Sequence, residues 1–97
     1  MRLKVTTTVW IYPGMAGKWH FVSLDKESTE KVKKHQKGKP RVGWGAVPVE
    51  VTVGKTTWRT SIFPDSKSGT YILPLKAEVR KKEGIYEGDV VTFVCVI

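Results

Sequence analysis

Cysteine is almost absent from this sequence of 97 residues, in which Cys95 is the only one. A single cysteine cannot form an intrachain disulfide, and it is too few for a zinc site built on thiolates. Cys95 stands between two valines in a strand-like setting, and no motif supplies a base to activate it. We therefore expect a buried packing residue rather than a nucleophile.

Long apolar runs are also missing. No stretch approaches the roughly 20 apolar residues that span a bilayer, so we expect no membrane association. After Arg2 and Lys4 the chain continues with three threonines instead of an apolar segment, so no signal peptide is visible. These features predict a cytoplasmic protein.

Motifs for catalysis and for cofactor binding are lacking as well. His20 and His35 have no second histidine, cysteine or carboxylate at ligand spacing on an expected helix. The sequence also has no P-loop, no dinucleotide-binding glycine fingerprint and no GxSxG motif. We expect no metal and no cofactor, and an enzyme is the least favoured class of function.

Acidic residues are scarce, since nine Asp and Glu stand against 17 Lys and Arg, and the formal net charge is +8. This excess favours nucleic acid or another polyanion as partner, although small soluble proteins without such a partner share it. Six Lys and Arg and no acid lie in residues 31–41. The alternative for this segment is a solvated loop, with the nearby tryptophan as a core plug or subunit contact. Candidate nucleic-acid contacts are Lys37, Lys39, Arg41 and Trp44.

What the chain has in quantity is short runs of alternating apolar and polar residues, which are typical of strands. Such a run covers residues 3–11, and the aromatic and β-branched residues 19–24 are expected to pair antiparallel with it. Asp25 can cap a surface helix that ends at about Gln36, with acids near its start and lysines near its end. A loop over residues 37–44 follows.

The most specific pattern predicts a hairpin around Gly54-Lys55. Valine occupies every second position from 47 to 53, and a glycine in the first turn position suits a type II′ turn. The turn fixes the register of the two strands, and in this register apolar residues pair on one face and opposite charges pair on the other. The expected pairs are Val53 with Thr56, Val51 with Trp58, Val49 with Thr60, Val47 with Ile62 and Glu50 with Arg59.

The remaining residues predict a turn over 63–69, a strand over 70–73 and a helix from Leu75 to Glu83. Gly84, followed by an apolar residue, is typical of a left-handed helix stop. Residues 90–97 are apolar on both faces except for Thr92, which predicts a central strand covered on both sides.

The two halves of the chain, about 1–53 and 57–97, can be laid over each other as β-β-α-β units. One such unit cannot bury its sheet faces alone. Two units related by a pseudo-two-fold axis can close into a small barrel with a helix at each end. We therefore expect a single domain over residues 1–97 that is mainly β, a small closed double-split β-barrel with two short helices.

Two family resemblances bear on this expectation. Gly69-Thr-Tyr-Ile-Leu-Pro74, Arg80, Gly84-Ile85 and Gly88-Asp89-Val90 resemble the half-barrel of the AbrB/MazE-type transcription factors and antitoxins. Those proteins form a double-split β-barrel, usually from two chains, so the resemblance implies that fold over about the last 30 residues. It also implies, as an alternative function, nucleic-acid binding of the AbrB type.

The whole chain resembles a family of small prokaryotic proteins known only as a domain of unknown function. The motifs that carry this resemblance begin at Arg41 (RVGWGAVPV), Trp58 (WRTSIFP) and Gly69 (GTYILPLKAEVR). Members occur alone or beside a bacteriocin-protection-type domain. The resemblance implies the double-split barrel and implies no catalytic residues.

Three polar residues are not required by this fold. Arg59 and Ser61 share one face of an expected strand, and Arg80 lies on the second helix, so together they form a candidate anion or ligand site. The alternative is a solvated face that carries a Glu50–Arg59 pair. We expect a non-enzymatic binding module, a monomer or homodimer, with nucleic-acid binding through residues 31–41 as the alternative.

Overall fold

The computed structural model describes residues 1–13, 19–39 and 45–97, which contain seven strands and two helices. The first half holds β1 (Arg2–Thr8), β2 (Trp10–Ile11), β3 (His20–Ser23), α1 (Lys26–Gln36) and β4 (Val47–Val53). The second half holds β5 (Thr56–Asp65), β6 (Thr70–Pro74), α2 (Ala77–Glu83) and β7 (Val90–Val96). The expectation of a mainly β chain with two short helices is confirmed.

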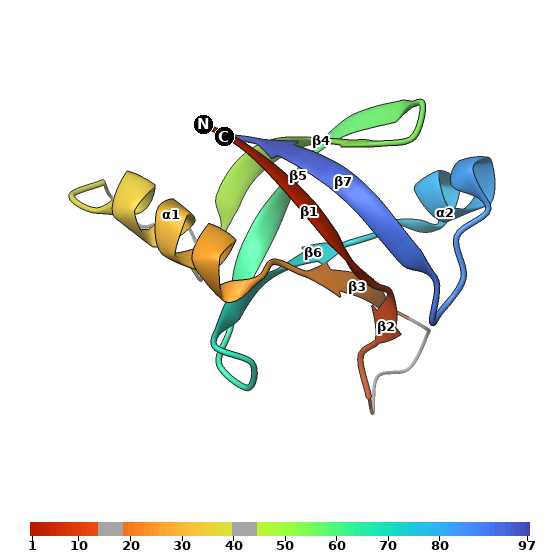
Figure 1. Ribbon diagram of the computed structural model, residues 1–97, viewed down its shortest axis with the longest axis horizontal. Coiled ribbons are helices and arrows are strands. Elements are labelled where there is room, and N and C mark those ends of the chain that lie inside the picture. Colours follow the sequence, from red (N-terminus) through yellow and green to blue (C-terminus); the bar gives the residue numbers. More distant parts are fainter. Residues whose placement is uncertain (14–18, 40–44) are drawn as a thin grey trace.

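The strands form one antiparallel sheet in the order β1-β7-β4-β5-β6-β3-β2. Because β2 follows β1 directly in the chain, the two ends of this order meet and the sheet curls into a nearly closed barrel (Figure 1). The long strand β5 pairs with β4 along its first part and with β6 along its last part, and so it joins the two sides of the barrel.

The β4–β5 hairpin has the predicted register throughout, with Val51 opposite Trp58 and Glu50 opposite Arg59. Gly54 has a φ of +56°, and among the described residues only glycines have positive φ. This combination fits a type II′ turn, because a type I′ turn would need a second positive φ at Lys55. Glu50 and Arg59 form no salt bridge with each other, although the register places them side by side.

Both helices begin and end close to the predicted positions. Asp25 caps α1, since its side chain accepts a hydrogen bond of 2.7 Å from the Ser28 N–H. Gly84 ends α2 in the left-handed conformation, and the Ile85 N–H returns to the Arg80 carbonyl at 2.9 Å. The two helices lie at opposite ends of the barrel (Figure 1).

Two predictions about strand limits and burial were wrong. Residues 63–65 belong to β5 rather than to a turn, because Phe63 and Pro64 continue in register with β6 after the pairing with β4 has ended at Ile62. Pro64 is tolerated there because a strand that has lost one neighbour does not need every N–H.

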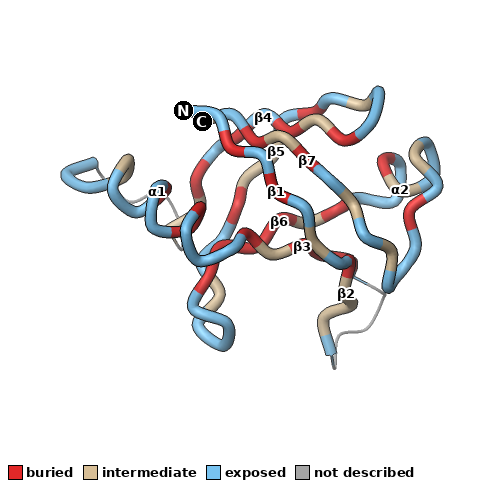
Figure 2. Tube along the Cα trace, viewed as in Figure 1, coloured by how far each residue is buried: buried red, intermediate tan, exposed pale blue. Residues whose placement is uncertain are grey.

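Strand β7 is central in the sheet, between β1 and β4, but only one of its faces is covered. Phe93 and Cys95 have no exposed surface, whereas Val90 is 68% exposed. The barrel interior receives one face of the strand, and the helices lie at the barrel ends rather than over β7 (Figures 1 and 2). Apolar composition alone therefore overestimated the burial of this strand.

The core fills the barrel with side chains from every strand except the short β2, in an alternating pattern that Figure 2 shows as red segments. Trp58 belongs to this core, and so does Cys95, whose burial the sequence predicted. Buried Val9, between β1 and β2, donates its N–H to the Asp89 carbonyl at 2.8 Å and thereby ties the chain to the start of β7. The chain ends are adjacent, because the Ile97 N–H donates to the Met1 carbonyl at 2.9 Å.

No helix in the described ranges has both the length and the apolar character needed to cross a bilayer.

Candidate functional site

The three residues proposed from the sequence as an anion site lie on two elements. Arg59 is exposed and Ser61 is half-buried on the outer face of β5, where their register partners are Glu50 and Pro48. Arg80 is half-buried on α2 and lines a cleft that neither of the other two lines. The structure thus brings Arg59 and Ser61 onto one strand face and places Arg80 elsewhere, so a joint site stays a prediction.

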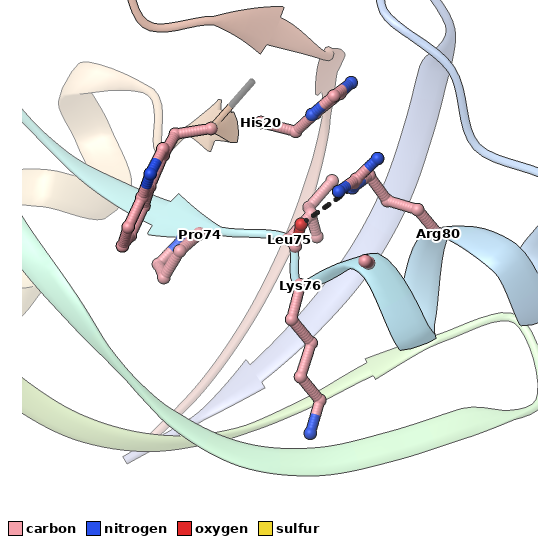
Figure 3. A pocket seen from close by; sticks show the side chains of 7 residues that line it. His20, Pro74, Leu75, Lys76 and Arg80 are labelled. Carbon is pink, nitrogen blue, oxygen red and sulfur yellow. Dashed lines mark hydrogen bonds between the residues drawn. The ribbon is translucent and has the colours of Figure 1, made fainter. Parts of the chain in front are cut away.

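The cleft at Arg80 has a volume of about 290 Å³. The Arg80 Nε–H donates to the Leu75 carbonyl at 3.0 Å, which holds the guanidinium over the cleft on the side of His20 (Figure 3). The Lys76 side chain extends away from Arg80 in the same view. The lining residues are Trp19, His20, Pro74, Leu75, Lys76, Ala77 and Arg80.

A groove of about 570 Å³ runs beside the second half of α1, and we call it the basic groove. One wall comes from α1 and the turn after it, and the other comes from the strands. Its lining residues are Lys33, Lys34, Gln36, Lys37, Gly38, Lys39, Gly45, Ala46, Val47, Pro48, Pro64 and Tyr71. Of the predicted nucleic-acid contacts, Lys37 and Lys39 line this groove, whereas Arg41 and Trp44 lie outside the described residues.

The position of α1 explains why lysines gather here. Ser28, Thr29 and Val32 are buried, and the Thr29 hydroxyl accepts a hydrogen bond of 3.2 Å from the Tyr71 N–H of β6. The first half of the helix is therefore fixed to the barrel. Helical periodicity then directs the following lysines along the groove and outward.

Acidic neighbours neutralise only part of this charge. Lys33 pairs with Glu30 at 3.6 Å, whereas the Lys39 Nζ contacts no acid in the described ranges and lies 3.2 Å from the His35 Nε2. Lys34 and Lys37 form no ion pair within the part of the chain that the structure describes. The groove therefore presents a net positive charge to solvent.

Asp25, the acid nearest the start of α1, is hydrogen-bonded to the first turn of the helix. Side-chain and backbone hydrogen bonds from Ser28 hold the pKa of Asp25 below its usual range, and the charge of Lys31 adds to this effect. Asp25 is thus ionised at neutral pH and stabilises the positive end of α1, at a distance from the lysines at the other end.

Sequence reasoning did not single out a group of four aromatic residues outside the contiguous core cluster, which we call the aromatic plate. It consists of Trp10, Tyr12, Trp19 and Phe21, whose ring centroids lie 5.2 to 6.4 Å apart in four pairs. The signal was available, since alternation places Trp10 and Tyr12 opposite to buried Val9. The antiparallel partner then adds Trp19 and Phe21 to the same face.

The lone cysteine has no exposed surface, and burial raises the pKa of the Cys95 thiol to about 11. A thiol in this state is a packing group. Among the residues that the structure describes, no three His, Cys, Asp or Glu side chains come together in a way that could hold a metal ion.

Fold and surface together define a small antiparallel barrel domain with a basic groove beside its first helix. The model of the family described as "Domain of unknown function (DUF1905)" matches residues 6–94, which is nearly the whole chain, and the chain belongs to this family. The predicted membership in a family of unknown function is therefore confirmed. No curated protein matches the chain.

Proposed function

We propose that this chain is a non-enzymatic binding module that takes a polyanion, with nucleic acid as the favoured class, in the basic groove. The observation that carries the proposal is the placement of Lys33, Lys34, Lys37 and Lys39 along one groove of about 570 Å³. The excess of basic residues over the whole chain, with a net charge of +8, supports the same class of ligand.

The chemistry of the groove favours contacts to phosphate rather than to base edges. Lysine ammonium groups are flexible point charges that bind phosphate without reading sequence. Tyr71 is only 8% exposed and the prolines of the groove carry no N–H, so the strand wall offers few donors for base recognition. Binding should therefore depend strongly on salt and weakly on sequence.

Neutralising Lys34 and Lys37, two groove lysines for which no side-chain partner is seen among the described residues, tests the groove directly. We expect Lys34→Gln/Lys37→Gln to lower the slope of log affinity against log salt by about two, because each lysine that contacts phosphate accounts for about one. The measurement is duplex DNA binding over a salt series, with elution from heparin as a second readout.

The matched control is Lys4→Gln/Lys81→Gln, which removes the same charge from exposed positions on β1 and α2. The control should bind almost as the wild type does. Equal losses in both variants would mean that net charge and not the groove determines binding. No binding by the wild type at low salt would contradict the proposal altogether.

We also propose that the barrel is a double-split barrel of two β-β-α-β halves, similar to the AbrB/MazE type. Two backbone hydrogen bonds of 2.9 Å support it, from the Leu24 N–H to the Tyr71 carbonyl and from the Leu75 N–H to the His20 carbonyl. Leu75 lies 51 positions after Leu24, and Tyr71 lies 51 positions after His20. Each bond therefore becomes the other when the residues of the two halves are exchanged by this shift. The first residues of α1 and α2, Lys26 and Ala77, differ by the same shift.

The strand pairs support the same relation. In this relation β1 and β2 correspond to the two parts of β5, β3 corresponds to β6, and β4 corresponds to β7. The β1–β7 pair then corresponds to the β5–β4 pair, and the β2–β3 pair to the β5–β6 pair. The two remaining pairs, β4–β7 and β3–β6, each join one strand from either half. The hairpin turn at Gly54-Lys55 then connects the halves, and the adjacent chain ends occupy the corresponding place.

A circular permutant tests this arrangement. The chain is opened between Gly54 and Lys55, and Ile97 is joined to Met1 by a short flexible linker. We expect it to fold with the same strand order and to unfold cooperatively, because the hydrogen-bonded ends are already adjacent. The measurements are amide exchange and thermal unfolding followed by circular dichroism.

The control permutant is opened between Arg59 and Thr60, inside the strand that joins both sides of the barrel, and it should not fold. If the first permutant is unfolded, or if both fold equally well, the junction between halves is misplaced.

A further inference from the structure

The aromatic plate is a layer separate from the barrel core. Phe21 is 7% exposed and yet lies outside the contiguous core cluster, so the other rings of the plate bury it from outside the barrel. The Trp10 ring stacks on the Phe21 ring, with centroids 5.2 Å apart. The Trp19 ring also stacks on the Phe21 ring, with centroids 6.4 Å apart. Trp19 remains 53% exposed, so the plate offers ring surface to solvent.

One ring of the plate is fixed by a hydrogen bond to a neighbouring side chain. The Trp10 Nε1–H donates to the Ser23 hydroxyl at 2.9 Å, which fixes the indole plane. Asp65 borders the same surface, and its carboxylate accepts a hydrogen bond of 2.8 Å from the Ser68 hydroxyl. The Trp10 indole is therefore held in one orientation before any ligand arrives.

Cations stand at both ends of the plate. At one end the Lys67 Nζ lies 5.8 Å from the centre of the Tyr12 ring. At the other end Trp19 lines the same cleft as Lys76 and Arg80. Flat rings between positive side chains are complementary to a chain of bases with phosphates on its backbone.

We propose that the aromatic plate stacks bases of a single-stranded nucleic acid, with Trp19 as the main stacking residue and Lys67, Lys76 and Arg80 as phosphate contacts. This assigns a second surface beyond the basic groove, and it rests on the proposed function for the class of ligand only. A duplex keeps its bases stacked internally and cannot use the rings, so the plate should prefer single strands.

The test uses the full chain and three probes: oligothymidylate, a duplex of equal length, and inorganic polyphosphate, which has phosphates but no bases. We expect oligothymidylate to quench tryptophan emission and to bind more tightly than the duplex. Trp19→Ala should weaken oligothymidylate binding about tenfold, since one stacked base contributes roughly 1–3 kcal/mol and 1.4 kcal/mol is a factor of ten. Binding of polyphosphate should not change.

Two further variants separate the possible causes. Trp19→Phe keeps a ring and should retain most of the affinity, and an unchanged melting temperature of Trp19→Ala shows that the fold is intact. A loss of oligothymidylate affinity with Trp19→Ala but none with Lys34→Gln/Lys37→Gln supports the plate, and an unchanged salt slope of Lys34→Gln/Lys37→Gln on duplex DNA overturns the groove.

Three results would overturn the plate as a stacking surface. The first is an unchanged affinity of Trp19→Ala for oligothymidylate. The second is an equal loss for polyphosphate, because that ligand has nothing to stack. The third is a dimer in sedimentation that Trp19→Ala dissociates, which would make a second copy of the chain the occupant.

Discussion

Phe93→Ala is expected to lower the free energy of unfolding by about 3–5 kcal/mol, the usual range for a fully buried phenylalanine. Phe93 has no exposed surface and lies on β7, which pairs with β1 on one side and β4 on the other. Truncation therefore leaves a cavity between three strands whose backbones are hydrogen-bonded and cannot close it. Urea unfolding followed by circular dichroism measures the change.

Phe63→Ala is the matched control, because it removes the same atoms from a side chain that is 37% exposed on β5. A loss of about 1 kcal/mol or less is expected there, as for most surface substitutions. Since small domains have a total stability of about 5–15 kcal/mol, the Phe93 variant should be close to unfolding near its physiological temperature. Equal losses in the two variants would contradict the assignment of Phe93 to the core.

Thr29→Val is expected to lower the free energy of unfolding by about 1–3 kcal/mol, the cost of a buried donor left without a partner. Thr29 is 1% exposed, and its hydroxyl accepts the Tyr71 N–H at 3.2 Å. Valine has nearly the same shape and cannot accept this bond. Amide exchange provides a specific readout, because the Tyr71 amide should lose more protection than its neighbours.

The control is Thr57→Val, which removes an exposed hydroxyl that bonds to Thr52 at 2.8 Å. Water can replace that bond, so stability should hardly change. If Thr29→Val is as stable as the wild type, α1 is held to the barrel by Val32 and its neighbours rather than by the hydrogen bond.

The features predicted correctly from the sequence are those in which several local signals coincide. In the β4–β5 hairpin the turn glycine, the alternating valines and the register all require the same pairing, and that pairing is observed. Asp25 likewise combines a cap residue with a charge that suits the helix start. Where local signals agree in this way, packing against the rest of the chain rarely changes the predicted element.

The errors concern features that depend on what lies beside a strand. Val90 and Phe93 are both apolar residues of β7, yet one is exposed and the other fully buried, because only one side of the strand faces the barrel interior. The continuation of β5 through Pro64 depends on where β4 ends, which local sequence does not specify.

The same limit applies to the candidate sites. The lysines of residues 31–41 were visible as a charge run, but the opposite wall of the groove comes from Pro48, Pro64 and Tyr71, which lie far apart in the sequence. Arg59 and Arg80 were grouped on the basis of chemistry alone, and in the structure Arg80 lines a cleft that Arg59 does not line, so their joint site stays a prediction.

The buried thiol has a practical consequence. Cys95 of β7 faces Val51 of β4, at the seam where one strand of each proposed half meets the other. With no exposed surface and a pKa of about 11, the thiol can be modified only in molecules whose seam has separated. The chain therefore carries its own reporter of opening, and a labelling rate above the rate of global unfolding would show that the two sides of the barrel come apart locally.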